Sequence, residues 1–348
     1  MNNSQIDFIR NDCLNVLSDV SALDGLKNQS VYMTGAAGFM GSWLLELISC
    51  LNDEFNFNIN VVATSRNWDE IEKERSHLYN KEYFSFLTVD VRHTFDIPED
   101  CKWIIHLAGT PDRRFHASDP LNTINSIIRG TENLLNEASR ITNLNKIVCL
   151  SSGHIYGKQP AKCRSIDEEN FFPSDCTNTI ECYIQAKRMA ENICQIYRSQ
   201  MRLPIAVLRP FSFIGPYQLV SRPWAINNFI YNALRGRSIR IEGNCNTVRS
   251  YMYPSDMAYW ILKYMQDSDD GDFLNLGSSD GQSLLKIAQL VAQNSDNNPS
   301  IETALNADSV SPSYFVPNVK KAKTKYGLKV NIPLEESIKR TVQWLKDE

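Results

Sequence analysis

Short apolar runs alternate with longer amphipathic segments over the first two thirds of the chain. The runs are rich in valine, isoleucine and other β-prone residues and are closed by glycine or polar residues, which is typical of buried strands. They lie at residues 31–33, 59–64, 84–91, 102–109, 147–150 and 205–208. Segments with helical spacing separate several of them, as at residues 43–51 and 121–138. The alternation predicts an α/β protein with a doubly wound parallel sheet, whose ligands bind at the carboxyl ends of the strands.

A glycine-rich turn joins the first predicted strand to the first predicted helix. Gly35 would allow the tight turn, Gly38 would let the backbone approach a pyrophosphate, and Gly41 would let helix and strand pack closely. Phe39 and Met40 of the turn are also predicted cofactor contacts, and the N–H groups and positive dipole end of the following helix suit phosphate oxygens. A second predicted strand at 59–64 follows the helix, and this strand–turn–helix–strand order predicts a Rossmann-type dinucleotide-binding unit.

The end of the second strand bears on which dinucleotide is bound. NAD-binding units usually place an acidic residue here to hold the adenosine ribose, whereas this chain has Ser65 and Arg66. An arginine can pair with a 2′-phosphate. The sequence therefore favours NADP(H), with NAD(H) possible and a solvated Arg66 as the alternative reading.

Residues after the later strands complete the predicted cofactor site. Asp90 and Val91, at the end of the predicted strand at 84–91, would lie at the adenine edge. Small residues at the end of the strand at 102–109 would let the cofactor phosphates come close. These predicted contacts are Asp90, Val91, Leu107, Ala108 and Gly109. His106 lies inside its strand, and we interpret it as a packed core histidine.

The same patterns predict the domain organisation. Residues 1–30 have apolar positions at helical spacing and predict a helical extension, and residues 31–215 form the Rossmann domain, to which some later segments return. Residues 216–348 are expected to form a smaller C-terminal α/β lobe. Its predicted elements are a strand near 238–243 and helices near 224–234, 284–293 and 334–345, with another helix capped by Ser255 or Asp256.

Composition excludes several classes of protein. The 348 residues are 43% hydrophobic and 22% charged with a net charge of −4, so no nucleic acid or membrane partner is indicated. No apolar run is long enough to cross a bilayer, and the N-terminus has no secretion signal. The nine cysteines form no CxxC pair, and the five histidines form no metal-binding pattern. We therefore expect a cytoplasmic protein with reduced thiols and no metal.

Candidate chemistry follows the strand at 147–150. Ser151 and Ser152 stand at a strand end that faces the predicted cofactor, and Tyr183 and Lys187 are one helical turn apart downstream. The chain here resembles the extended short-chain dehydrogenase/reductase superfamily, in its nucleotide-sugar epimerase, dehydratase and reductase branch. The resemblance rests on "TGAAGFMG", "HLAG", "SSGHIYG" and the Tyr183–Lys187 spacing, and covers almost everything after residue 30.

The resemblance implies a role for each of these residues. Tyr183 would carry the proton of the sugar oxygen, and Ser152 would hydrogen-bond that oxygen. Lys187 would hold the nicotinamide ribose and lower the pKa of Tyr183. Lowering that pKa from about 10 to about 7 requires about 4 kcal/mol of stabilisation of the phenolate. Ser151 would be structural, with its hydroxyl turned towards backbone.

Two positions depart from the family pattern. Dehydrating relatives carry an acid/base carboxylate pair where this chain has Gly153 and His154, and decarboxylating relatives often have an acid at the second position. His154 is then either a proton carrier or a neutral residue that shapes the sugar site. Ile127 replaces an asparagine found in many relatives.

The resemblance also names substrate contacts in the second lobe. Arg249 would clamp a substrate diphosphate, Arg222 is a weaker second candidate, and Ser212 stands where relatives place asparagine near that diphosphate. The implied partner is a nucleotide-diphosphate sugar. A homodimer is also implied, through the helix that carries Tyr183 and the helix at residues 121–138.

The reaction itself is left open by the sequence. The first hypothesis is NADPH-dependent reduction of a 4-keto(-6-deoxy)hexose at C4, with Tyr183 as proton donor, because the carboxylate pair is missing and Arg66 suits NADP(H). A 4-epimerase with tightly bound NAD(P) needs the same residues. A 4,6-dehydratase or decarboxylase is less favoured, and a non-catalytic NADP-binding sensor would typically lose the Tyr–Lys pair.

Overall fold

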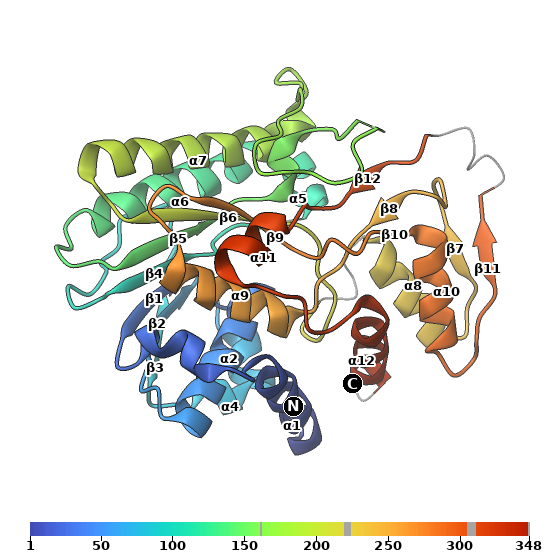
Figure 1. Ribbon diagram of the computed structural model, residues 1–348, viewed down its shortest axis with the longest axis horizontal. Helices are drawn as coiled ribbons and strands as arrows, with labels where there is room; N and C mark the ends of the chain where they lie inside the picture. Colours follow the sequence, from blue (N-terminus) through green and yellow to red (C-terminus); the bar gives the residue numbers. More distant parts are fainter. Residues whose placement is uncertain (111, 161, 219–223, 305–310, 347–348) are drawn as a thin grey trace. The chain divides into compact units, whose positions relative to one another are not determined.

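The computed structural model describes residues 1–110, 112–160, 162–218, 224–304 and 311–346 (Figure 1). The chain divides into two compact units, and the division is not a single cut near residue 215. The first unit comprises Met1–Ile155, Ser174–Pro210 and Ala258–Leu274. The second comprises Tyr156–Pro173, Phe211–Met257 and Asn275–Glu348. Local patterns in the sequence cannot show to which unit a returning segment packs.

A seven-stranded sheet organises the first unit, in the order β3-β2-β1-β4-β5-β6-β9. Its strands are β1 (Ser30–Thr34), β2 (Asn60–Ser65), β3 (Phe84–Thr88), β4 (Trp103–His106), β5 (Lys146–Leu150), β6 (Ile205–Pro210) and β9 (Phe273–Leu276). The pairs from β3 to β6 are parallel, and the register sets Thr34 opposite both Thr64 and His106. The predicted doubly wound sheet is confirmed, and the ends of these strands share one edge.

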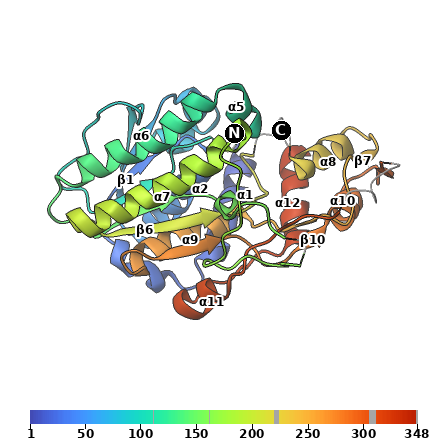
Figure 2. The same cartoon turned by 90° about the horizontal axis from the view of Figure 1, so that it is seen from above.

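Helices surround this sheet. They are α1 (Asn3–Val16), α2 (Phe39–Phe55), α3 (Asp69–Glu74), α4 (Ser76–Tyr79), α5 (Arg113–Ser118), α6 (Pro120–Ala138), α7 (Cys182–Met201) and α9 (Pro254–Asp267), with short 3₁₀ turns at Val20–Leu26, Gly153–Tyr156 and Thr179–Glu181. In both views α6 and α7 lie side by side on one face, and α2 lies on the other (Figures 1 and 2). Leu134 of α6 and Cys194 of α7 pack with Ile104 and Ile147 of the sheet.

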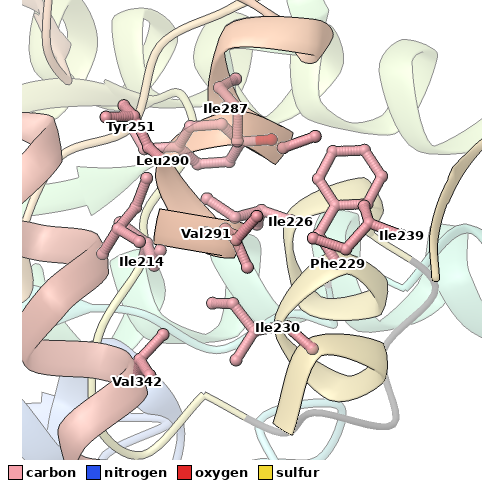
Figure 3. Packing of buried hydrophobic residues seen from close by; sticks show 14 of the residues in the cluster. Ile214, Ile226, Phe229, Ile230, Ile239, Tyr251, Ile287, Leu290, Val291 and Val342 are labelled. Atoms are coloured by element: carbon pink, nitrogen blue, oxygen red, sulfur yellow. The ribbon is translucent and has the colours of Figure 1, made fainter. Parts of the chain in front are cut away.

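The second unit has its own small sheets and helices. A three-stranded sheet contains β8 (Val248–Arg249), β10 (Gln282–Ser283) and β12 (Tyr314–Phe315), and a pair contains β7 (Ile239–Ile241) and β11 (Ile301–Thr303). The remaining helices are α8 (Ala225–Leu234), α10 (Leu284–Gln293), α11 (Lys320–Tyr326) and α12 (Leu334–Lys346). Figure 3 shows Phe229 and Ile230 of α8 meeting Val291 of α10 and Val342 of α12 in a core.

The start of α9 differs from the sequence prediction. This helix begins at Pro254, so Ser255 and Asp256 lie inside its first turn rather than at the cap. The Asp256 carboxylate instead accepts hydrogen bonds from the backbone N–H groups of Asn331 and Ile332, at 3.0 and 2.9 Å. It therefore ties α9 to a segment that is distant in the sequence, which a local capping pattern cannot reveal.

No helix in the described ranges combines the length and apolarity needed to span a membrane.

Candidate active site

The glycine turn between β1 and α2 provides the phosphate-binding half of the candidate site. Gly35 has φ of +70°, and a Cβ there would lie 2.8 Å from the backbone N of Ala108. A Cβ on Gly41 would lie 2.3 Å from the carbonyl O of Ala36, whereas one on Gly38 would meet only Gly35 O at 3.2 Å. Gly35 and Gly41 thus close the turn, and Gly38 leaves its outer side open.

The first turn of α2 suits an anionic ligand. Gly38 is the N-cap, so no side chain caps this end of the helix before Phe39, Met40 and Gly41. Backbone N–H groups at this end can therefore donate hydrogen bonds to phosphate oxygens, and the positive end of the helix dipole favours their negative charge. The open side of Gly38 and this uncapped turn together fit a dinucleotide pyrophosphate.

The ends of β2 and β3 place the predicted adenosine contacts. Ser65 is half-buried and Arg66 is exposed. The two carboxylate oxygens of Asp90 accept hydrogen bonds from Arg92 Nε, at 2.9 and 3.0 Å. This pairing lowers the pKa of Asp90 to about 2, and the backbone N–H of Arg92 and the charge of Arg66 contribute to the shift. Val91 is buried, and its carbonyl accepts a hydrogen bond from Asn133 at 2.9 Å. Asp90 is thus ionised and already engaged.

The segment after β4 lies between the glycine turn and Lys187. Leu107 N donates to Thr34 O at 3.1 Å, and Ala108 N lies 3.4 Å from Thr34 Oγ1. A Cβ on Gly109 would lie 3.7 Å from Lys187 Nζ, with no closer neighbour. A small residue at 109 therefore leaves space between this segment and the lysine.

Ser152, Tyr183 and Lys187 come together within the first unit. Lys187 donates from Nζ to the carbonyl O of Leu150 at 2.6 Å, so α7 is bound to the carboxyl end of β5. Ser152 follows two residues later and is hydrogen-bonded to Tyr183. The Ser152 hydroxyl also accepts from His154 N at 3.2 Å. The arrangement holds a hydroxyl, a phenol and an ammonium near one strand end.

The electrostatics of this group differ from the sequence expectation. Burial lowers the pKa of Lys187 from 10.5 to about 8, so the side chain is still mostly an ammonium at neutral pH. Burial raises the pKa of Tyr183 above 10, and the hydrogen bond to Ser152 only partly offsets this. The lowered pKa expected for Tyr183 is therefore wrong for the protein by itself, because burial disfavours the phenolate.

Two other predictions, and the departure from the family pattern at Ile127, can be compared with the structure. His106 is 3% exposed, and its pKa falls to about 3 through burial, which confirms the core histidine. The hydroxyl of Ser151 was expected to bond backbone, but this is wrong, since it has no hydrogen-bond partner among the described residues. Ile127, the replacement for asparagine, packs against Ala186, Ala190 and Tyr183.

The predicted substrate residues do not form one described cluster. His154 is exposed in the first unit, whereas Ser212 and Arg249 belong to the second. Arg249 donates to Val248 O and Ser313 O at 2.8 and 3.2 Å, and burial lowers its pKa. Arg222 lies outside the described residues. In the part of the chain that the structure describes, no group of three His, Cys, Asp or Glu side chains could hold a metal.

Sequence reasoning missed His116 on α5. Its ring stacks on the ring of Tyr183, with centroids 4.2 Å apart and planes 9° apart. A six-residue helix is too short for its apolar spacing to predict which side faces the core. The local signal for this helix was Asp112, which caps α5 by accepting a hydrogen bond from Arg114 N at 3.0 Å.

Comparison with known proteins decides the family. The sequence model described as the NAD dependent epimerase/dehydratase family matches residues 31–277, which include the glycine turn and Ser152, Tyr183 and Lys187. The chain belongs to this family. Among curated members, it is 26% identical over 329 residues to UDP-glucuronic acid decarboxylase 1 of Xenopus tropicalis, covering 94% of this chain and 75% of that protein. It is 27% identical over 313 residues to UDP-glucuronic acid decarboxylase 5 of Arabidopsis thaliana, covering 89% and 87%.

Solved structures of the family share the fold. UDP-glucuronic acid 4-epimerase from Bacillus cereus, in complex with UDP-glucuronic acid and NAD, has a TM-score of 0.76 at 21% identity, over 92% of this chain and 99% of that one. The Bordetella bronchiseptica enzyme WbmF in complex with NAD⁺ has a TM-score of 0.73 at 20% identity, over 93% and 94%. These similarities establish the architecture of the family member described here.

Proposed function

We propose that this protein is a nucleotide-sugar 4-epimerase, which oxidises the sugar at C4 and reduces it again with the same retained NAD. The observation that carries the proposal is the grouping of Ser152, Tyr183 and Lys187 at the end of β5, beside the Gly109 segment. A hydroxyl donor, a phenol and an ammonium suit interconversion of an alcohol and a ketone. The epimerases among the structural neighbours support the redox-neutral form of that chemistry.

The side chains of this protein would divide the proton chemistry among them. Ser152 would orient the C4 oxygen by a hydrogen bond, and Tyr183 would take the proton of the C4 hydroxyl as the ketone forms and return it later. Tyr183 must first ionise, and the ammonium of Lys187 favours the phenolate electrostatically. The hydride acceptor and donor for C4 would be supplied by the nicotinamide of bound NAD.

The cofactor would be held by backbone as much as by side chains. The residues that would contact it are Gly35, Gly38, Phe39, Met40, Gly41, Ser65, Arg66, Asp90, Val91, Leu107, Ala108, Gly109, Tyr183 and Lys187. We propose NAD as the retained cofactor, because the structural neighbours named above were solved with NAD. The NADP(H) preference predicted from Arg66 stays a prediction, and the exposed guanidinium could still pair with a 2′-phosphate.

The second candidate function is decarboxylation of a UDP-uronic acid. The curated relatives named above are UDP-glucuronic acid decarboxylases, which favours it. Oxidation at C4 turns a uronic acid into a β-keto acid, so the same three residues could begin either reaction. We rank decarboxylation second because His154 stands where decarboxylating relatives often carry an acid. Reduction of a 4-keto(-6-deoxy)hexose by NADPH, the first hypothesis from the sequence, ranks third because none of the similar proteins named above is described as a ketoreductase.

The experiment that separates these functions uses the purified protein without added cofactor. Denaturation and chromatography of the supernatant identify any retained NAD or NADP. UDP-glucose, UDP-N-acetylglucosamine and UDP-glucuronic acid are then supplied separately, with Tyr183→Phe as the inactive control. We expect a 4-epimer of at least one sugar and no net change in nicotinamide absorbance. Release of CO₂ from UDP-glucuronic acid would favour the decarboxylase, and consumption of supplied NADPH by a 4-keto sugar would favour the reductase.

A homodimer is also proposed, through α6 and α7. Several large apolar side chains on these two helices are exposed: Leu121 by 73%, Met189 by 48%, Ile196 by 41% and Met201 by 54%. Met189 and Ile196 are seven residues apart, so they lie on the same side of α7. A Met189→Glu variant is expected to be a monomer by light scattering where the parent is a dimer.

A further inference from the structure

The stack between His116 and Tyr183 joins two elements of the first unit. The imidazole comes from α5 and the phenol from the first turn of α7, and the ring planes differ by only 9° at a centroid distance of 4.2 Å. His116 is 4% exposed, so its ring is held within the protein rather than lying on the surface. Contact of this kind covers one face of the phenol.

Hydrogen bonds fix the imidazole ring. His116 Nε2 lies 2.6 Å from the carbonyl O of Thr110, and a carbonyl can only accept, so Nε2 carries the proton. Burial lowers the pKa of His116, which keeps the ring neutral with Nδ1 unprotonated. The backbone carbonyl of His116 also lies 3.7 Å from Cys182 Sγ, at the start of α7. The ring is thus held by Thr110, and the backbone of His116 contacts the helix of Tyr183.

Tyr183 has apolar neighbours besides His116. It packs against the cluster of Ile127, Ala186 and Ala190, in which Ile127 replaces the asparagine of many relatives. None of these aliphatic side chains can define the plane of a ring as a parallel aromatic ring does. The hydrogen bond to Ser152 fixes only the oxygen, since rotation about χ2 of tyrosine is soft.

We propose that His116 is a positioning residue, whose stacked imidazole fixes the plane of the Tyr183 phenol and with it the direction of the O–H bond, which lies in the ring plane, while the bond to Ser152 holds the oxygen itself. This deepens the function proposed above and rests on it, because the alignment matters for proton transfer at the sugar C4 oxygen. Histidine meets both requirements of the position: its face stacks on the phenol, and its N–H satisfies the Thr110 carbonyl. A phenylalanine at this position would keep the stack on Tyr183 but lose the hydrogen bond to Thr110. A leucine would lose both contacts.

Kinetics of three variants test the positioning role. His116→Leu is expected to lower kcat roughly 10- to 100-fold with KM and NAD content little changed, because a misaligned proton carrier slows chemistry rather than binding. His116→Phe should recover most of that loss. Ala117→Ser, at the exposed next position of α5, is the matched control and should leave kcat unchanged. Thermal unfolding of each variant identifies any that fail to fold.

A second measurement does not depend on turnover. In protein with ¹³C-labelled tyrosine rings, the Tyr183 resonances, assigned by their loss in Tyr183→Phe, should show the upfield ring-current shift of a stacked neighbour. The shift should disappear in His116→Leu and persist in His116→Phe. If it persists in the leucine variant, the stack is absent and the inference is overturned.

The kinetic outcomes also decide the inference. Unchanged kcat in His116→Leu overturns it, and so does a loss that His116→Phe fails to recover, since the N–H alone would then matter. If the parent converts no UDP-sugar, the proposed function has failed. The ring-current result then decides by itself whether His116 fixes the ring of Tyr183.

Discussion

Lys187 Nζ donates a hydrogen bond to the carbonyl O of Leu150 at 2.6 Å, which joins helix α7 to the end of strand β5. Ser152 lies two residues beyond Leu150, and Tyr183 lies one turn before Lys187 on the same helix. This contact holds the helix that carries Tyr183 and Lys187 against the strand end that leads to Ser152. Lys187 is 7% exposed, so the contact also compensates part of the lost hydration of its ammonium.

The role of Tyr183 is tested by removing one oxygen atom. Tyr183→Phe is expected to lower turnover by roughly 10²- to 10⁴-fold, the usual contribution of a general acid–base group. NAD content should stay close to that of the parent, since the ring and its packing remain. Tyr197→Phe is the matched control, because Tyr197 is on the same helix but bonds Asn136. A Tyr183→Phe variant as active as the parent would refute the role assigned to the phenol.

The buried Lys187 should make stability depend on pH. Its pKa is about 8 in the folded protein and 10.5 in the unfolded chain, so between these values the unfolded chain binds more protons. Stability from this group therefore rises with pH across that window, and below about pH 8 the full burial penalty applies. Relative to Lys187→Met, the parent should gain about 2 kcal/mol in unfolding free energy from about pH 7 to about pH 10.

Urea unfolding at the two pH values measures that gain. Lys158→Met, at an exposed lysine, is the control for loss of one positive charge and should parallel the parent. Parallel curves for the parent and Lys187→Met would show that Lys187 keeps its ordinary pKa in the folded protein.

Two glycines of the turn should respond differently to an added methyl group. Gly41→Ala places Cβ within 2.3 Å of the backbone of Ala36, which cannot move freely, so a loss of about 1–3 kcal/mol in unfolding free energy is expected. Gly38→Ala meets only Gly35 O at 3.2 Å and should fold with nearly parental stability. Its methyl group would nevertheless stand where the pyrophosphate approaches, and NAD affinity should fall at least about tenfold. Urea unfolding and cofactor titration of both variants check this, and parental NAD binding by Gly38→Ala would contradict the placement of the phosphates.

We expect Arg66 to determine how well NADP is accepted. Its guanidinium is exposed at the end of β2 and interacts electrostatically with Asp90. Arg66→Glu should weaken NADP binding by at least about tenfold through repulsion of the 2′-phosphate, and NAD binding by much less. Calorimetry with cofactor-free protein measures both affinities, and Arg66→Gln separates charge loss from charge reversal. Equal effects on the two cofactors would mean that Arg66 does not contact the 2′-phosphate.

Much of the cofactor half of the site was predictable, because its signals are local. Glycines at fixed spacing between an apolar strand and a helix mark the β1–α2 turn, and the strands at 59–64 and 147–150 in the prediction correspond to β2 and β5. The Tyr183–Lys187 spacing on one helix was equally local. Such patterns identify a nucleotide fold even though they name no substrate.

Long-range contacts account for what the sequence did not reveal. The stack of His116 on Tyr183, the Asp256 bonds to Asn331 and Ile332, and the burial that raises the pKa of Tyr183 all depend on segments that meet only after folding. Ser151 illustrates the same limit, since its hydroxyl is buried without the backbone partner that its position in the turn suggested.

The most direct test of the account follows the hydrogen at C4. The protein as purified is incubated with UDP-glucuronic acid deuterated at C4, without added cofactor, and the products are analysed by mass spectrometry and NMR. A 4-epimerase that retains NAD should give the 4-epimer with deuterium retained at C4, no released CO₂ and no net change in nicotinamide absorbance, with UDP-glucose and UDP-N-acetylglucosamine as parallel substrates. Conversion of a 4-keto sugar that consumes one NADPH per product, with no epimer from any of the three UDP-sugars, would contradict it.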